Sequence, residues 1–223
     1  MRQKIFFLIV FGINICCVFA QPFEGTIRAE YFVAESNSVV FLEWFFSPGR
    51  VALEMRPSLN KDSVKQSTRF LMEEDGDEMK ILSTMPDGKK YFNTMEETSI
   101  HAGEGFNYKS FETVKTEEFS VLLNNKCRKL FSKTNSIKST CWVAENLEIN
   151  IIDYSKFLKS DYDILAMRNW DMKGFPLKSV TTTLHGDLVS TMLVTEINPK
   201  KLEKKEFEIP SGTEEWEGGS KKE

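Results

Sequence analysis

One short run of residues restricts the fold more than any other feature of this sequence. Residues 39–47 are rich in β-branched and aromatic side chains and lie between turn signals, so they are predicted to form a strand. Its two faces consist of Val40, Leu42, Trp44 and Phe46 on one side and of Phe41, Glu43 and Phe45 on the other. A sheet with one wet face should alternate apolar and polar residues. Because both faces are largely apolar here, we expect a helix, a loop or a ligand to cover the second face.

The rest of the chain reads mainly as strands separated by turns, with little helical signal. Helices are expected at Tyr154–Arg168 and, more briefly, at Leu59–Gln66. These elements predict an α+β fold built on a mostly antiparallel sheet, and such a sheet often curves to enclose a cavity. The further expected strands are Thr26–Val33, Arg50–Arg56, Thr68–Glu74, Glu78–Thr84, Lys89–Met95, Phe119–Ser132, Lys138–Ala144, Leu177–Leu184, Leu188–Ile197 and Phe207–Ile209.

The N-terminus has the three-part layout of a secretory signal peptide. Arg2 and Lys4 form a basic start, the run 5–19 is almost wholly apolar, and the segment ends at Ala20 with small residues at the expected places. The apolar run is shorter than the roughly 18 residues that span a bilayer as a helix. We therefore predict cleavage near Ala20 and a periplasmic or secreted protein.

Two alternatives to cleavage remain open. The segment could be retained as an anchor, or Cys16 or Cys17 could be lipidated, although Ile15 stands where lipidation requires a small residue. With residues 1–20 removed, the net charge moves from −4 to −6, because two basic residues and no acids are lost. An acidic chain without a clustered basic face argues against nucleic-acid binding. Residues 21–212 are expected to form one domain, and 213–223 a disordered tail.

The two cysteines after the signal lie around a predicted hairpin turn. The midpoint of Cys127 and Cys141 falls inside Lys133–Ser136, so a symmetric hairpin would place the two cysteines opposite each other. In an oxidising compartment this arrangement predicts a structural disulfide. Two buried thiols or a redox site are the competing interpretations, and the absence of C-x-x-C spacing weighs against the latter.

Motifs for catalysis and cofactor binding are missing from the sequence. The two histidines, His101 and His185, lie outside any zinc-ligand spacing. There is no G-x-S-x-G elbow, and Gly103–Gly105 lacks the rest of a phosphate-binding fingerprint. The acidic run 73–78 lacks calcium-loop spacing and is predicted to be a solvated hairpin turn. We expect no enzyme activity, no metal and no cofactor.

Several short motifs, in their order along the chain, resemble a family of exported bacterial proteins of unknown function. The resemblance covers most of residues 23–212, and the sequence departs from it at Asn124-Asn125, where the family usually has Gly-Tyr-Lys-Cys. The motifs are Phe23–Ile27, Asn125–Leu130 with Cys141–Val143, Gly174–Lys178, Val194–Asn198 and Phe207–Gly212.

That family is similar in fold to the lipoprotein-carrier proteins of the LolA and LolB type. The resemblance implies a half-barrel: an open, curved antiparallel sheet with one or two helices on its concave side. It also implies a cavity that could hold a lipid or an acyl chain, with an unknown envelope protein as a further partner. Fold alone does not fix function.

Three functions are therefore compared. The first is a carrier-like module that binds a hydrophobic ligand, with the 154–168 helix as a lid. The second is a structural or interaction domain whose half-barrel is filled by its own side chains, and the third, an enzyme, is disfavoured. The sequence does not say which face of the 39–46 strand lines the cavity. The residues expected to line it are Phe41, Trp44, Phe45, Phe46, Phe70 and Tyr91.

Overall fold

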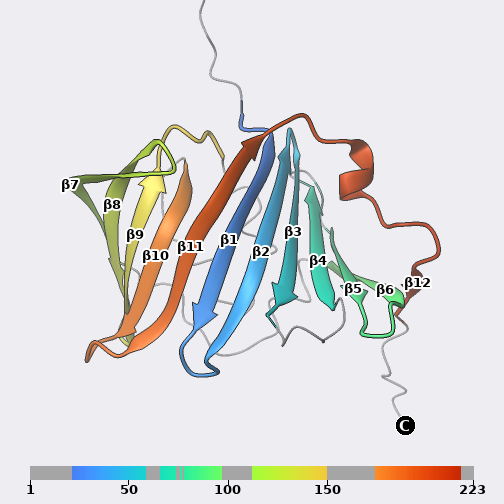
Figure 1. The fold of residues 1–223 in the computed structure, drawn as a ribbon, viewed down its shortest axis with the longest axis horizontal. Coiled ribbons are helices and arrows are strands. Elements are labelled where there is room, and N and C mark those ends of the chain that lie inside the picture. The colour runs from blue at the N-terminus through green and yellow to red at the C-terminus, as the bar shows by residue number, and fades with distance from the viewer. Residues whose placement is uncertain are drawn as a thin grey trace, which may run out of the picture.

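A single antiparallel sheet accounts for nearly all of the described chain (Figure 1). The structure, a computed structural model, describes residues 22–58, 66–73, 76, 78–96, 112–149 and 174–216. The strands are β1 (Gly25–Val33), β2 (Ser38–Ser47), β3 (Arg50–Pro57), β4 (Ser67–Glu73), β5 (Glu78–Thr84), β6 (Lys90–Glu96), β7 (Glu112–Leu122), β8 (Asn125–Lys133), β9 (Ile137–Ala144), β10 (Phe175–Thr183), β11 (Leu188–Pro199) and β12 (Glu214–Glu215).

The sheet consists of two meanders joined along one long ladder. Its strand order is β12-β6-β5-β4-β3-β2-β1-β11-β10-β9-β8-β7, and only the short β12 pairs in parallel. β1 and β11 join the two halves, from Gly25 opposite Pro199 to Val33 opposite Ser190. β7 and β12 form opposite edges of the sheet, which is therefore open. This confirms the predicted mostly antiparallel, curved sheet.

The inner face of the sheet carries the main hydrophobic core. One cluster of buried side chains extends from Met79 on β5 to Leu130 on β8. β10 and β2 are separated by β11 and β1 in the sheet, so the ring contacts of Phe175 on β10 with Trp44 and Phe46 on β2 require the sheet to bend around this face, which is the concave one. Phe175 on β10 links the two halves, because its ring meets Trp44 edge-on at 5.2 Å and Phe46 at 5.8 Å between centroids.

A row of ion pairs crosses the outer face over β11, β1, β2, β3 and β4. At its centre the Glu43 carboxylate accepts hydrogen bonds from Arg28 Nε at 2.8 Å and from Arg56 Nη2 at 2.7 Å. The Glu43 side chain is only 9% exposed. Arg28 also pairs with Glu196. On the other side the row continues from Arg56 to Glu54 and on to Arg69 and Glu206.

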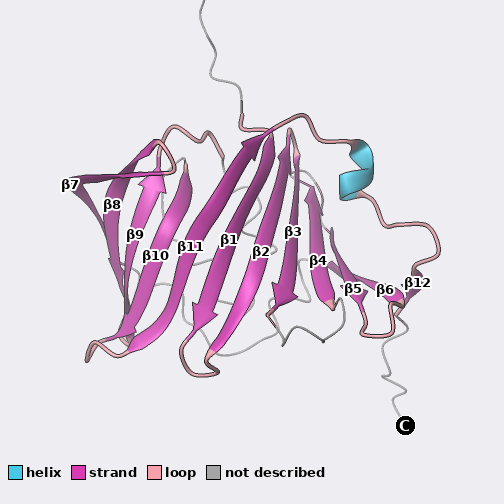
Figure 2. Cartoon of the chain, viewed as in Figure 1, coloured by secondary structure: helices cyan, strands magenta, loops and turns pink. Residues whose placement is uncertain are grey.

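A C-terminal strap, residues 200–216, covers the next row of the outer face. It contains the one 3₁₀ helix of the described chain, η4 (Lys204–Phe207) (Figure 2). Beneath the strap lie three buried apolar side chains from β2, β3 and β4. These are Phe45, Ala52 and Leu71, and they pack against Leu202, Phe207 and Ile209. The second apolar face of β2 is therefore covered by a loop segment at Phe45, one of the three covers expected, whereas Phe41 on the same face is exposed.

Polar contacts fix the strap at both ends and in the middle. The Glu24 carboxylate accepts a hydrogen bond from the Leu202 amide at 3.0 Å. Arg69 Nη2 donates to the Glu206 carbonyl at 2.6 Å, and its guanidinium lies 4.3 Å from the centre of the Phe45 ring. At the far edge the Trp216 amide donates to the Phe92 carbonyl at 2.7 Å. β12 and Trp216, which lie beyond the predicted domain end at 212, are thus attached to the sheet.

Two predicted strands differ from the structure. Phe119–Ser132 is not one strand: β7 ends at Leu122 and β8 begins at Asn125, with φ of 47° at Leu123 and 61° at Asn124. A two-residue hairpin turn needs such left-handed residues, but leucine rarely adopts this conformation, so the turn was hidden in the sequence. Residues 207–209 form no strand, because the chain there leaves η4 and packs over Phe45. The helices expected at 154–168 and 59–66 lie outside the described residues, except for Gln66.

We predict that Glu43 holds the outer face together. Glu43→Gln keeps the shape of the side chain but leaves two arginines facing a neutral amide, so the free energy of unfolding should fall by about 1–3 kcal/mol. Glu196→Gln is the matched control, because its side chain is 45% exposed and the loss should stay below about 1 kcal/mol. Urea denaturation measures both, and equal losses would contradict the prediction.

Candidate functional site

The inner face opens toward the β6 edge of the sheet. One row of neighbouring residues runs from Trp44 through Leu53, Phe70 and Ile81 to Asn93. Trp44 and Leu53 are each 2% exposed, Phe70 and Ile81 are partly buried, and Asn93 is exposed. The apolar surface is thus sealed at β2 and β3 and accessible at β4 and β5. The accessible part is the candidate site of the inner face.

Four methionines lie on the same side of the sheet, and two of them, Met72 and Met79, are buried. Met72, Met79 and Met95 are direct neighbours on β4, β5 and β6, and Met55 lies nearby on β3. Met55 and Met95 are only partly buried. Methionine side chains are unbranched and polarizable, so a surface built from them adapts to apolar molecules of different shapes.

The opposite end of the inner face is lined by small hydroxyl groups. Ser132, Ser139, Thr181 and Ser190 are consecutive neighbours across β8, β9, β10 and β11, and all are buried. Ser139 Oγ and Thr181 Oγ1 share a hydrogen bond of 2.5 Å. The sequence analysis missed this row, because serine and threonine in a strand normally indicate the solvent face. The signal was their regular alternation with Lys133, Lys138 and other outward residues.

The residues predicted to line a cavity separate onto two faces. Trp44, Phe46 and Phe70 lie on the inner face, and Tyr91 shares that face through its pairing with Ser83. Phe41 and Phe45 lie on the outer face: Phe41 is 43% exposed, and Phe45 is buried under the strap. Four of the six aromatics thus share one side, which the sequence could not assign.

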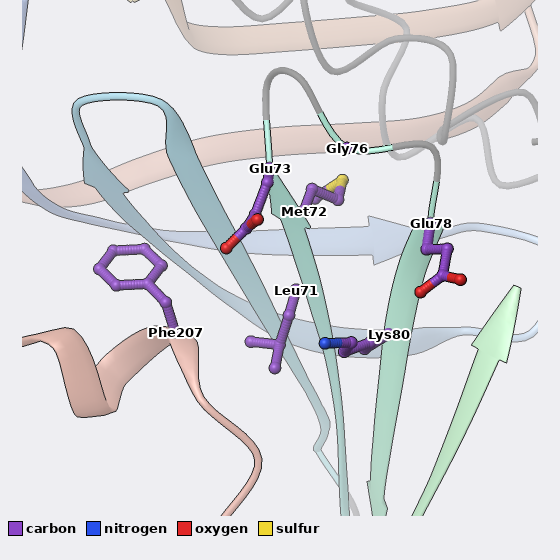
Figure 3. A pocket seen from close by; sticks show the side chains of 7 residues that line it. All are labelled: Leu71, Met72, Glu73, Gly76, Glu78, Lys80 and Phe207. Atoms are coloured by element: carbon purple, nitrogen blue, oxygen red, sulfur yellow. The ribbon is translucent and has the colours of Figure 1, made fainter. Parts of the chain in front are cut away.

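The described residues also form a pocket on the outer side, beside the strap (Figure 3). It has a volume of about 290 Å³. Leu71 and Phe207 give it an apolar side, and Glu73, Glu78 and Lys80 give it a charged one, whereas Met72 points away from them. None of the predicted cavity residues lines this pocket. Its mixed lining and position at the β4–β5 turn set it apart from the inner face.

A comparison with models of protein families identifies the family of this chain. The model of a domain of unknown function, DUF4412, matches residues 23–213. The chain belongs to the DUF4412 family. This confirms the predicted membership of a family without a known function. No curated protein matches this DUF4412 chain.

Solved structures resemble the DUF4412 sheet only distantly. An uncharacterised conserved protein from Thermus thermophilus has a TM-score of 0.47 at 9% identity, over 86% of this chain and 90% of that one. A Vibrio parahaemolyticus domain, assigned provisionally to outer membrane lipoprotein sorting, has a TM-score of 0.36 at 8% identity, over 82% and 87%. PNGF-II has a TM-score of 0.44 at 13% identity over 85% of this chain. The chain spans 30% of the PNGF-II length. These values are too low to transfer a function.

The described residues contain no cluster of three or more His, Cys, Asp or Glu side chains that could hold a metal ion. Within the same residues, no helix is long and apolar enough to cross a membrane. His185 lies in the turn between β10 and β11 and is exposed. His101 and the signal segment 1–20 lie outside the described residues.

The structure does not contain the predicted disulfide between Cys127 and Cys141. In the β8–β9 hairpin Cys127 lies opposite Ala144, and Cys141 lies opposite Leu130. The turn is therefore displaced from the predicted midpoint, and the two sulfurs are not bonded to each other. Both side chains are buried. Burial raises the pKa of the Cys127 thiol, because a thiolate would lose its hydration there.

We predict that both cysteines are unreactive thiols in the folded protein. Iodoacetamide should modify Cys127 and Cys141 slowly under native conditions, because they are 0% and 1% exposed. Both should react fully in denaturant without a reducing agent, and intact mass spectrometry counts the added groups. If the denatured chain takes up no label, the two cysteines form a disulfide and this prediction fails.

Proposed function

We propose that this DUF4412 protein is an exported, carrier-like module that binds a hydrophobic molecule on the inner face of its sheet and catalyses no reaction. The observation that carries the proposal is the partly accessible apolar surface on the inner side of the sheet near β6. Met55, Phe70, Ile81 and Met95 are only partly buried there, whereas Met72 and Met79 are buried beside them. A lipid or an acyl chain is the ligand class that such a surface suits.

The two ends of the inner face differ in chemistry and in access. The β4–β6 end is aromatic and thioether-rich and is partly accessible, whereas the row containing Ser139 and Thr181 is buried, and these two hydroxyl groups bond each other. A buried polar group needs a hydrogen-bonding partner, and here the protein supplies it. The β4–β6 end is therefore the part of the face that suits an apolar chain.

Export is proposed from the N-terminal sequence alone. Residues 1–20 have the basic start, apolar centre and small-residue end of a secretory signal. Envelope or extracellular location would also bring the protein close to lipids. The absence of a catalytic role is proposed because no nucleophile, base and orienting group were found together in the sequence motifs.

We predict that changes at Phe70 weaken ligand binding, whereas changes at Phe41 do not. Phe70→Ser places a hydroxyl on the accessible inner surface, and the affinity for a fluorescent fatty acid should fall about tenfold or more. Phe41→Ser makes the same chemical change on the outer face, where the ring is 43% exposed, and should leave the affinity unchanged. Fluorescence titration of residues 21–223 measures both.

Native mass spectrometry of the exported protein, purified without detergent, completes this test. A bound lipid of defined mass is expected. If the wild-type chain is free of ligand and does not bind the fluorescent fatty acid, the carrier proposal fails. A structural or interaction domain with a packed half-barrel would then be the better description.

A further inference from the structure

The outer face of β8, β9 and β10 differs in charge from the rest of the protein. These three adjacent strands contain no aspartate or glutamate but hold six basic residues. The whole chain, in contrast, has a net charge of −4. Positive charge is therefore concentrated on one part of an otherwise acidic molecule, although the sequence analysis found no clustered basic face. The strands are contiguous in the sheet, so the cluster appears only after folding.

Most of these cations share one face with two aromatic rings. The register aligns Lys129 with Trp142 and Lys178, and Lys133 with Lys138. Phe131 lies between Lys129 and Lys133 on β8 and is 39% exposed. We call this surface the lysine face, defined by Lys129, Lys133, Lys138, Lys178, Phe131 and Trp142. The remaining outward positions on the three strands are Val180 and two threonines, Thr140 and Thr182.

Lysine ammonium groups lie close to both rings. Lys129 Nζ is 4.8 Å from the centre of the Phe131 ring, and Lys178 Nζ is 4.9 Å from the Trp142 ring. Lys129 also pairs with Glu118 at 2.8 Å. Lys133, Lys138 and Lys178 form no ion pair with any residue that the structure describes. Three of the four lysines thus place positive charge near apolar rings without an ion pair to a described residue, although Glu112 is the neighbour of Lys133 on β7.

Exposed apolar side chains continue on both sides of the lysine face. Val114, the neighbour of Phe131 on β7, is 58% exposed, and Leu193, the neighbour of Lys178 on β11, is 47% exposed. Elsewhere on the outer face, beyond the row of ion pairs, the apolar side chains Phe45 and Leu71 are covered by the strap. The two parts of the outer face are therefore different: one is covered by the chain itself, and the other is open.

From this arrangement we infer that the lysine face is a docking surface for an anionic lipid bilayer. Lysines attract the negative headgroups, and Trp142 and Phe131 are of the residue types that favour the boundary between headgroups and acyl chains. A protein partner fits less well. Lysine is depleted in protein interfaces, and their apolar residues gather in a central patch, whereas here rings and lysines alternate. The inference does not depend on the proposed ligand of the inner face.

The test is sedimentation of residues 21–223, which contain every described strand, with phosphatidylcholine vesicles that either include or lack phosphatidylglycerol. The wild-type chain should bind only the anionic vesicles, and added salt should release it. The double variant Lys133→Glu/Lys138→Glu should lower the partition coefficient at least about tenfold, because two attractive charges become repulsive. Both side chains are exposed, so the variant should fold normally, which its thermal melting curve checks.

Lys200→Glu/Lys201→Glu is the matched control, because it makes the same charge change at exposed positions on the strap. It should bind like the wild-type chain. An equal loss in the control, or no preference of the wild-type chain for anionic vesicles, would overturn the inference. Binding to native envelope membranes should also survive protease treatment of those membranes. If protease abolishes it, the partner is a protein and the lipid assignment is wrong.

Discussion

The two-faced strand β2 depends on the buried carboxylate of Glu43. A strand at the centre of a large sheet with aromatic residues on both sides would otherwise expose an apolar surface to water. Glu43 interrupts that surface and is held by Arg28 and Arg56 from the two neighbouring strands. Because each arginine is about half exposed, the carboxylate is paired while the guanidinium groups keep part of their hydration, which limits the cost of burying charge. The same row reaches Arg69, so that the ion pairs that join the central strands also anchor the strap at Glu206.

The strap completes this arrangement on the other side of the row. Phe45 lies between the Arg69 guanidinium and the apolar side chains of residues 202–209. Without the strap, a hydrophobic patch would lie open beside a charged row. With it, the row of Phe45, Ala52 and Leu71 on the outer face is covered by a loop segment and needs no helix. Apolar side chains stay accessible on both faces, at Phe70 and Ile81 inside and at Phe41 and Leu193 outside.

The sequence predicted the strands well, because alternation and turn residues are local signals. It failed where the signal was not local. The turn at Leu123-Asn124 begins with a leucine in a conformation that leucine disfavours, so only Asn124, which tolerates that conformation, marked it. The cysteine pairing failed because symmetry about a turn cannot fix the register: a small displacement of the turn moved Cys127 opposite Ala144. The inward side of Trp44 and Phe46 could not be assigned, since alternation gives two equivalent faces and only the packing of Phe175 distinguishes them.

The faces of one sheet can therefore serve different purposes because each row of residues meets a different environment. On β8, for example, Ser132 points inward and is buried, whereas its neighbours Phe131 and Lys133 point outward and are exposed. A strand gives this separation without extra structure, because successive side chains alternate between its faces. The accessible apolar surface lies inside β4 to β6 and the lysine face lies outside β8 to β10, so the two surfaces stand toward opposite ends of one curved sheet. A bilayer bound at the lysine face would therefore leave the ligand surface uncovered.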